Sequence, residues 1–180
     1  MGRAKGTNLL HMFTWVEREF GVSTWEKVLH GLSPDEQRRA RNILPVRWYD
    51  LGLQHRILRA IDRELGRGDG GLVDVIGRYE ADQDLSVIHR VFMRMASPSY
   101  ILERSRDYWE RFYDTGAWHV ERLGGNHTRG ELRGVEPFDP LFARYLHAYI
   151  HRMFELTGAK DLQTRYEVRD EAMIMHGEWS

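Results

Sequence analysis

The strongest pattern of apolar and polar positions in the chain lies between residues 139 and 157. Apolar side chains recur there at helical spacing over an arc of roughly 220°, which is wider than a one-sided surface helix needs. Asp139 can cap this helix, Pro140 suits its first position and Gly158 ends it. The pattern therefore predicts one long, mostly buried helix around which the last third of the chain is organised.

The remaining face of this helix is a narrow polar stripe that consists of Arg144, His147, His151 and Glu155. His147 and His151 are four residues apart and, with Glu155 as a third ligand, could share a divalent metal ion. The simpler interpretation places all four side chains on a solvent-exposed face, and we favour it. We therefore predict no metal site, with His147 and His151 as the alternative.

On both sides of the 139–157 helix, the spacing of apolar residues changes from helical to alternating, which is typical of strands. Two strands, about 117–123 and 129–135, are separated by turn residues at 124–126. Residues 162–168 alternate most clearly, and Asp170 and Glu171 can turn that strand into residues 172–179. We predict a ββαββ unit with an antiparallel sheet, because four strands and a helix bury a face that neither hairpin could bury alone.

Before residue 117 the pattern is helical, and we predict about seven helices, which begin near residues 8, 23, 34, 50, 72, 84 and 97. Ser33, Pro34 and Glu36 have the spacing of a cap, a first-turn proline and a capping-box glutamate. Ser23 and Asp50 are the expected caps of the second and fourth helices. The fold class is thus predicted as α+β. Residues 1–180 form a single domain, in which a helical region over 1–116 precedes a sheet-plus-helix region over 117–180.

Composition narrows the classes of function. The 180 residues include 26 lysines and arginines against 27 acidic residues, so no overall positive charge attracts nucleic acid. The absence of cysteine excludes disulfides, thiolate catalysis and cysteine-ligated metal centres. No apolar run reaches the ~20 residues of a membrane span, and the first residues lack a signal-peptide core. We expect a cytoplasmic protein that binds no nucleic acid and does not span a membrane.

No catalytic constellation is present, and the glycine-x-serine-x-glycine signature of serine hydrolases is absent. We therefore predict no catalytic residues. The candidate ligand-binding residues are Tyr108 and Trp109 on the 97–114 helix and Tyr145 and Tyr149 on the 139–157 helix. A four-stranded sheet covers only about half of the 220° apolar arc, so other helices, especially the 97–114 helix, a second copy of the chain or a protein partner must cover the rest. These four aromatic residues are predicted to border an apolar pocket or a dimer contact, and the alternative is plain core packing.

The order of the elements resembles a known fold. The GVSTWEKVL second helix, Pro45 ahead of the helix that starts at Asp50, and the closing RYEVRD strand carry this resemblance over nearly the whole chain. It is to the haem-nitric-oxide-binding (H-NOX) fold and its relatives, the vinyl-4-reductase sensor domains and TRAPP-type trafficking subunits. The chain is also similar to an uncharacterised myxobacterial, and hence bacterial, paralogous family. The resemblance implies a non-enzymatic sensory or adaptor domain that binds a small apolar ligand or a protein partner and forms a homodimer.

The same resemblance allows the sequence to be checked for the residues that bind haem. In haem-binding members, a histidine on the helix before the first hairpin ligates the iron, and a tyrosine-x-serine-x-arginine motif holds the propionates. Here the 97–114 helix has no histidine and residues 131–144 lack the motif, while His89 and His119 flank that helix at other positions. We expect a haem-free protein without other cofactors. Two alternatives stay open: an enzyme whose site assembles at a subunit interface, and a structural scaffold without a ligand.

Overall fold

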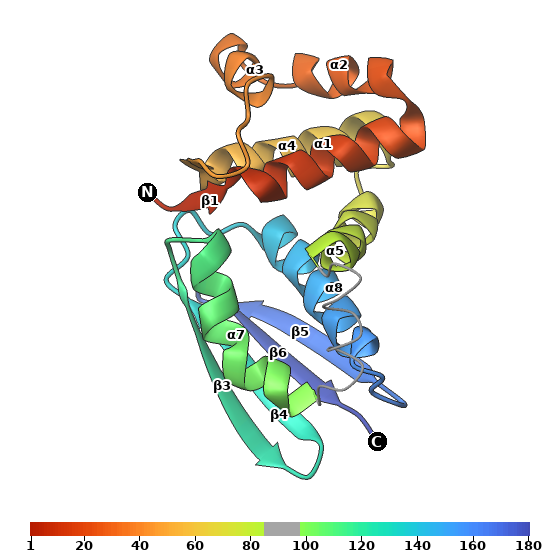
Figure 1. The fold of residues 1–180 in the computed structure, drawn as a ribbon. Helices are drawn as coiled ribbons and strands as arrows, with labels where there is room; N and C mark the ends of the chain where they lie inside the picture. The colour runs from red at the N-terminus through yellow and green to blue at the C-terminus, as the bar shows by residue number, and fades with distance from the viewer. Residues whose placement is uncertain (85–97) are drawn as a thin grey trace.

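The computed structural model describes residues 1–84 and 98–180 of the 180-residue chain. Within these ranges the fold is α+β, as predicted (Figure 1). The helices are α1 (Gly6–Phe20), α2 (Val22–His30), α3 (Pro34–Ala40), α4 (Leu51–Leu65), α5 (Gly71–Asp84), α7 (Pro98–Phe112) and α8 (Pro140–Leu156). The strands are β1 (Arg3–Lys5), β2 (Trp48–Asp50), β3 (Ala117–Gly124), β4 (His127–Arg133), β5 (Gln163–Arg169) and β6 (Ala172–Glu178). The helix predicted over 84–96 lies outside the described residues, apart from Asp84 at the end of α5.

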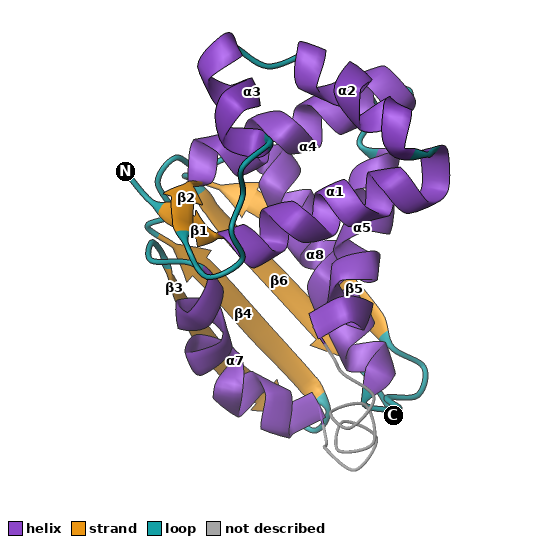
Figure 2. Ribbon diagram, turned by 45° about the horizontal axis from the view of Figure 1, so that its top comes forward, coloured by secondary structure: helices purple, strands orange, loops and turns teal. Residues whose placement is uncertain are grey.

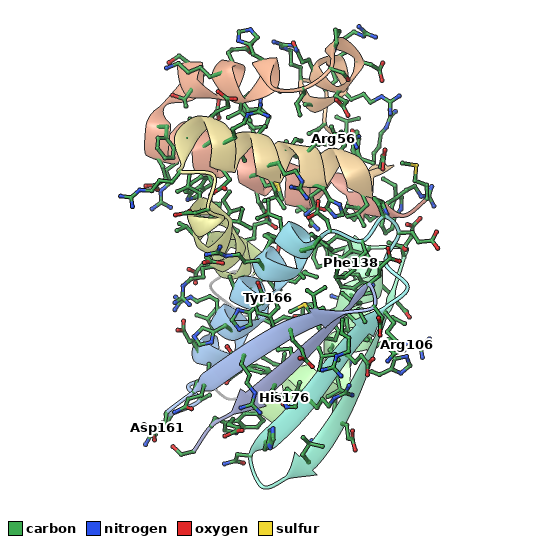
Figure 3. The ribbon with its side chains drawn as sticks, turned by 180° about the vertical axis from the view of Figure 1, so that it is seen from behind. Arg56, Arg106, Phe138, Asp161, Tyr166 and His176 are labelled. Carbon is green, nitrogen blue, oxygen red and sulfur yellow. The ribbon has the colours of Figure 1, made fainter. Side chains whose placement is uncertain are left out.

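The last four strands form one antiparallel sheet in the order β3-β4-β6-β5, so both predicted hairpins are confirmed. In the β5–β6 turn, Asp170 and Glu171 both have positive φ angles, 49° and 55°, which suit a tight two-residue hairpin loop. Helices α7 and α8 lie on the same face of this sheet (Figures 1 and 2). The opposite face, which carries His176, faces the viewer in Figure 3 and no described helix covers it there.

Helix starts follow the sequence signals with one exception. The Ser33–Glu36 capping box is present, and the side chains of Asp50 and Asp139 accept hydrogen bonds from the first turns of α4 and α8. The prediction that Ser23 caps the second helix was wrong. α2 already begins at Val22, directly after Gly21, and it has no side-chain cap. Gly21 has a φ of 89°, which allows the chain to turn sharply from α1 into α2 without a linker in which a cap could stand.

The sequence pattern missed a two-stranded ribbon, in which β1 pairs with β2. Each strand has three residues, too few for an alternating pattern to be recognised. The ribbon holds the N-terminus near the far end of α7, because Arg3 pairs with Asp114 and Gly2 N donates to the Glu136 carbonyl at 2.7 Å. The short sheet therefore connects the N-terminal helices to the segments that enter and leave the β3–β4 hairpin (Figure 2).

Helix α8 is largely buried, as its wide apolar arc predicted. Phe142, Tyr145 and Phe154 are almost fully buried, and a single hydrophobic cluster joins residues of α8 to residues of α1, α4 and the sheet. The expectation that the 97–114 helix is the main cover of α8 was wrong. Helix α5 packs most extensively along it.

A glycine makes this close packing of α5 on α8 possible. A Cβ atom at Gly77 would lie 2.5 Å from the carbonyl oxygen of Tyr145 and 3.2 Å from Cβ of Ala148. Both closest neighbours lie along the α8 backbone, which cannot move aside as a flexible side chain can. The two helices therefore approach to a distance that any other residue at position 77 would prevent.

The polar stripe of α8 is not solvent-exposed, so that interpretation was wrong. Arg144 forms an ion pair with Asp74 of α5 at 2.6 Å, and Glu155 with Arg78 at 2.7 Å. His147 and His151 are half-buried against β5. The stripe is polar because it pairs with α5 and β5. No helix among the described residues is long and apolar enough to cross a membrane.

We predict that Gly77→Ala destabilises the protein although alanine favours helix by about 1 kcal/mol over glycine. Forcing an extra carbon into a close-packed contact typically costs about 1–3 kcal/mol. The measurement is the free energy of unfolding from urea denaturation. Gly31→Ala is the matched control, because its Cβ would meet mainly the mobile end of Arg63. Equal or higher stability of Gly77→Ala would show that the α5–α8 contact does not depend on this glycine.

Candidate functional site

An apolar cavity of about 110 Å³ lies between α7, α8 and the sheet, where the sequence analysis placed any ligand pocket. Its floor is a row of residues in register across three strands: Val120 of β3, Gly130 of β4 and Met175 of β6. Gly130 contributes no side chain to this row, and the Trp118 ring lies over it, since a Cβ atom at Gly130 would be 3.1 Å from that ring. The walls are almost entirely apolar, and the cavity opens partly to solvent.

All four candidate residues line this cavity: Tyr108 and Trp109 from α7, and Tyr145 and Tyr149 from α8. The Trp109 ring is held in place, because its Nε1 donates to the Thr115 carbonyl at 2.8 Å and the ring stacks on Tyr113 at 4.2 Å between centroids. Tyr108 is half-buried. The structure thus brings the four residues together, while their role in binding a ligand stays a prediction.

Sequence reasoning missed the polar end of the cavity. Glu80 and Asp84, one turn apart on α5, line it together with Asn8 of α1. The Tyr145 hydroxyl donates to Glu80, and the Tyr149 hydroxyl donates to Asp84 at 2.6 Å. A signal was available, since both the two acids and the two tyrosines are spaced i, i+4. Such spacing places each pair on one face of its helix, so two packed helices can match them.

Burial raises the pKa of both acids, Glu80 and Asp84. The Glu80 side chain is 1% exposed, and burial raises its pKa well above the ordinary value, while the hydrogen bond from Tyr145 opposes the rise. Burial likewise raises the pKa of Asp84, against the hydrogen bond from Tyr149 and the nearby His11. Removing a carboxylate from water disfavours its charged form. Glu80 therefore retains its proton to a higher pH than a surface glutamate.

His147 and His151 do not form a metal site with Glu155 in this arrangement. The Thr164 hydroxyl lies 2.9 Å from His147 Nε2 and 2.8 Å from His151 Nδ1, and so lies between the two rings. The other nitrogen of His151, Nε2, lies 3.1 Å from Glu155. Across residues 1–84 and 98–180, no group of three or more potential metal-ligating side chains comes together. The two histidines instead connect α8 to β5.

Haem does not fit the residues that line this cavity. The side chains that α7 turns toward it include Ile101, Ser105 and Trp109 but no histidine, and His119 is exposed on β3. His89 lies outside the described residues. In the described part of the lining, no arginine or lysine is available for propionates, and the ionisable acids Glu80 and Asp84 would repel them. The lining formed by residues 1–84 and 98–180 therefore lacks both the iron ligand and the basic partners that a haem of this type needs.

We predict that stability decreases with rising pH because of Glu80. Since its pKa is raised in the folded state, unfolding releases its proton at any pH between its ordinary value of 4.5 and the raised value. The free energy of unfolding therefore falls as pH rises through this window. Glu80→Gln should reduce this fall, measured as the free energy of unfolding in urea between pH 5 and pH 8. Asp84 contributes with the same sign and remains, so the fall should shrink without disappearing. Parallel curves for the two proteins would contradict the assignment.

We also predict that added haemin does not bind stoichiometrically, because the lining offers no histidine on α7 and no base for the propionates. Absorbance titration should show no saturable one-to-one shift of the Soret band. A saturable shift that is lost when Ser105→Phe fills the cavity would contradict this prediction.

Comparison with known proteins yields structural neighbours only. No family model and no curated protein matches the sequence. Among solved structures, the Fe(II) unliganded H-NOX protein from K. algicida superposes with a TM-score of 0.74 at 10% identity, covering 98% of this chain and 96% of that one. The Fe(II)NO form of an H-NOX protein from S. oneidensis gives 0.74 at 13% identity, covering 98% and 99%. A Cs H-NOX mutant with an unnatural amino acid gives 0.71 at 11% identity, covering 98% and 96%. The chain therefore has an H-NOX-like fold, as the resemblance in its sequence predicted.

Proposed function

We propose that this chain is a non-enzymatic sensory or adaptor domain that binds a small apolar ligand between α7, α8 and the sheet. The observation that carries the proposal is the cavity itself, which has apolar walls and a small polar end formed by Glu80, Asp84 and Asn8. Ligand sites typically combine apolar walls with a few polar groups that orient the ligand. Well-packed protein interiors leave few voids of this size.

The size of the cavity limits the ligand. An engineered apolar cavity of about 150 Å³ binds benzene, and this cavity measures about 110 Å³. A ligand with one small ring or a short branched chain matches it. The structural neighbours agree with a small-ligand role, since the S. oneidensis H-NOX protein was solved with NO on its iron. Because the described residues around the cavity offer no haem ligand, the proposed ligand contacts the protein directly.

Binding here would act on α7. This helix forms one wall of the cavity and has many exposed side chains on its other face, among them Arg106 and Glu110. Its C-terminal end is held through Arg3 and Asp114, whereas its N-terminal half is joined to β3 by the exposed ion pair of Glu103 with Arg122. A ligand inserted beneath the helix would shift that half relative to the sheet. A protein partner that binds the exposed face of α7 could recognise this shift. Self-association and a protein partner, the other half of the sequence-based expectation, remain predictions.

The experiment is to bind a neutral probe of the right size, benzyl alcohol, and detect it by saturation-transfer NMR. Ser105→Phe places a ring in the cavity from α7 and should abolish the signal, because Ser105 lines the cavity and is half-buried. Asp107→Phe is the matched control, since it adds the same side chain at an exposed position of the same helix and should leave binding unchanged.

Circular dichroism of both variants checks that the fold is kept. If benzyl alcohol does not bind the wild-type protein, or binds equally to folded Ser105→Phe, the cavity is not a ligand site. The residues around it would then belong to a ligand-free scaffold.

A further inference from the structure

One buried acid in the cavity lacks a partner. Glu80 is 1% exposed and lines the cavity, and only one of its two carboxyl oxygens is bonded, by the hydroxyl of Tyr145. The other oxygen, Oε1, has no hydrogen-bond partner among the described residues. Buried polar atoms without partners are rare in folded proteins and call for an explanation. A ligand group that binds this oxygen would supply one.

The polar groups at this end offer acceptors. The hydroxyls of Tyr145 and Tyr149 already direct their protons to Glu80 and Asp84, so neither is free to donate to a ligand. The described lining contains these two acids and no arginine or lysine. An ionised carboxyl group only accepts hydrogen bonds, so a ligand that brings donors suits this end of the cavity, and a positively charged donor matches two acids best.

The walls favour the same kind of ligand. Trp109, Trp118 and Tyr108 present aromatic rings to the cavity. Aromatic rings provide large apolar surfaces, so they suit the apolar body of such a ligand. That body would lie against these rings, among which Trp118 covers Gly130 of the sheet.

Building on the proposed function, we propose that the cavity takes a small apolar amine whose ammonium group is bound by the carboxyl groups of Glu80 and Asp84. The Glu80 carboxyl group turns its unpaired Oε1, which is buried in the empty protein, toward the ammonium group, and the apolar body lies between the aromatic residues of α7 and the sheet. Tyr145 and Tyr149 act as positioning residues, because their hydroxyls hold the two carboxyl groups in place.

Binding of this kind changes the protonation of Glu80. Burial raises its pKa, so the acid holds its proton in the empty cavity, and an ammonium group beside it favours the ionised form. Each amine that binds as the ammonium ion then displaces one proton from Glu80 to water. Affinity for the amine should rise with pH until Glu80 is already ionised in the free protein.

Several other titratable groups surround Glu80 and Asp84. They are Tyr79 of α5, Tyr145 and Tyr149 of α8, Tyr113 after α7 and His11 of α1.

The test compares three probes of one size and different charge: benzylamine, benzyl alcohol and benzoate. Isothermal titration calorimetry at pH 7 should show benzylamine binding at least about tenfold more tightly than benzyl alcohol, a difference of ~1.4 kcal/mol. Benzoate should not bind. Buffers of different ionisation enthalpy should reveal proton release for benzylamine and none for benzyl alcohol.

Variants assign the effect to the two acids. Glu80→Gln should weaken benzylamine binding about tenfold or more and leave benzyl alcohol within about twofold, because the amide keeps the shape without the charge. Asp84→Asn should act in the same direction. Asp74→Asn is the matched control, since it removes a carboxyl group of α5 that pairs with Arg144 outside the cavity, and it should change neither affinity.

The outcomes separate this inference from the proposed function. If benzyl alcohol binds and benzylamine is no tighter, the amine proposal is overturned and the ligand cavity stands. The amine proposal also fails if the preference for benzylamine survives in both Glu80→Gln and Asp84→Asn with their folds intact. If none of the three probes binds the wild-type protein, the proposed function itself fails, and this inference with it.

Discussion

The close packing of α5 on α8 is the contact on which the rest of this structure depends. Gly77 allows the two helices to approach until a Cβ atom at that position would lie 2.5 Å from the Tyr145 carbonyl oxygen. At that separation the hydroxyls of Tyr145 and Tyr149 reach the carboxyl groups of Glu80 and Asp84. A larger residue at position 77 would separate the helices and take the two hydroxyl donors away from the buried Glu80 and the half-buried Asp84. Shape and polarity at this contact are therefore linked.

The cavity follows from how the remaining face of α8 is covered. Helix α7 lies over the same sheet but is held through its far end, where the Trp109 ring stacks on Tyr113 and Arg3 pairs with Asp114. Large rings on α7 and α8 meet a strand row whose central residue, Gly130, is covered by the Trp118 ring, and together they leave the cavity between the two helices and the sheet. The aromatic residues thus border the cavity while still belonging to the core.

The fold and the chemistry of its cavity give different information about function. The H-NOX proteins that this chain resembles are described with iron in the Fe(II) state, whereas the described lining of this cavity has no histidine and no base but does have one buried and one half-buried acid. At identities of 10–13% only the fold is shared, and one fold can carry many functions. The position of the cavity and its two acids are the observations on which the proposed amine ligand rests.

The sequence by itself determined the elements whose signals are local. The bounds and burial of α8, the hairpin at Asp170 and the capping box at Ser33 were all predicted, because each depends on residues within about twenty positions of one another. The four candidate aromatic residues also lie beside a cavity between α7, α8 and the sheet, and their role in binding remains a prediction.

Only the tertiary structure decided which residues that lie far apart in the chain pair with each other. The β1–β2 ribbon, the pairing of Arg144 with Asp74 and the burial of Glu80 join residues about 45 to 70 positions apart, and neither apolar spacing nor capping rules carry information across such distances. From the sequence, a carboxyl group on a helix is expected to be exposed to solvent, because no local signal shows that another helix covers it. For Glu80 that helix is α8.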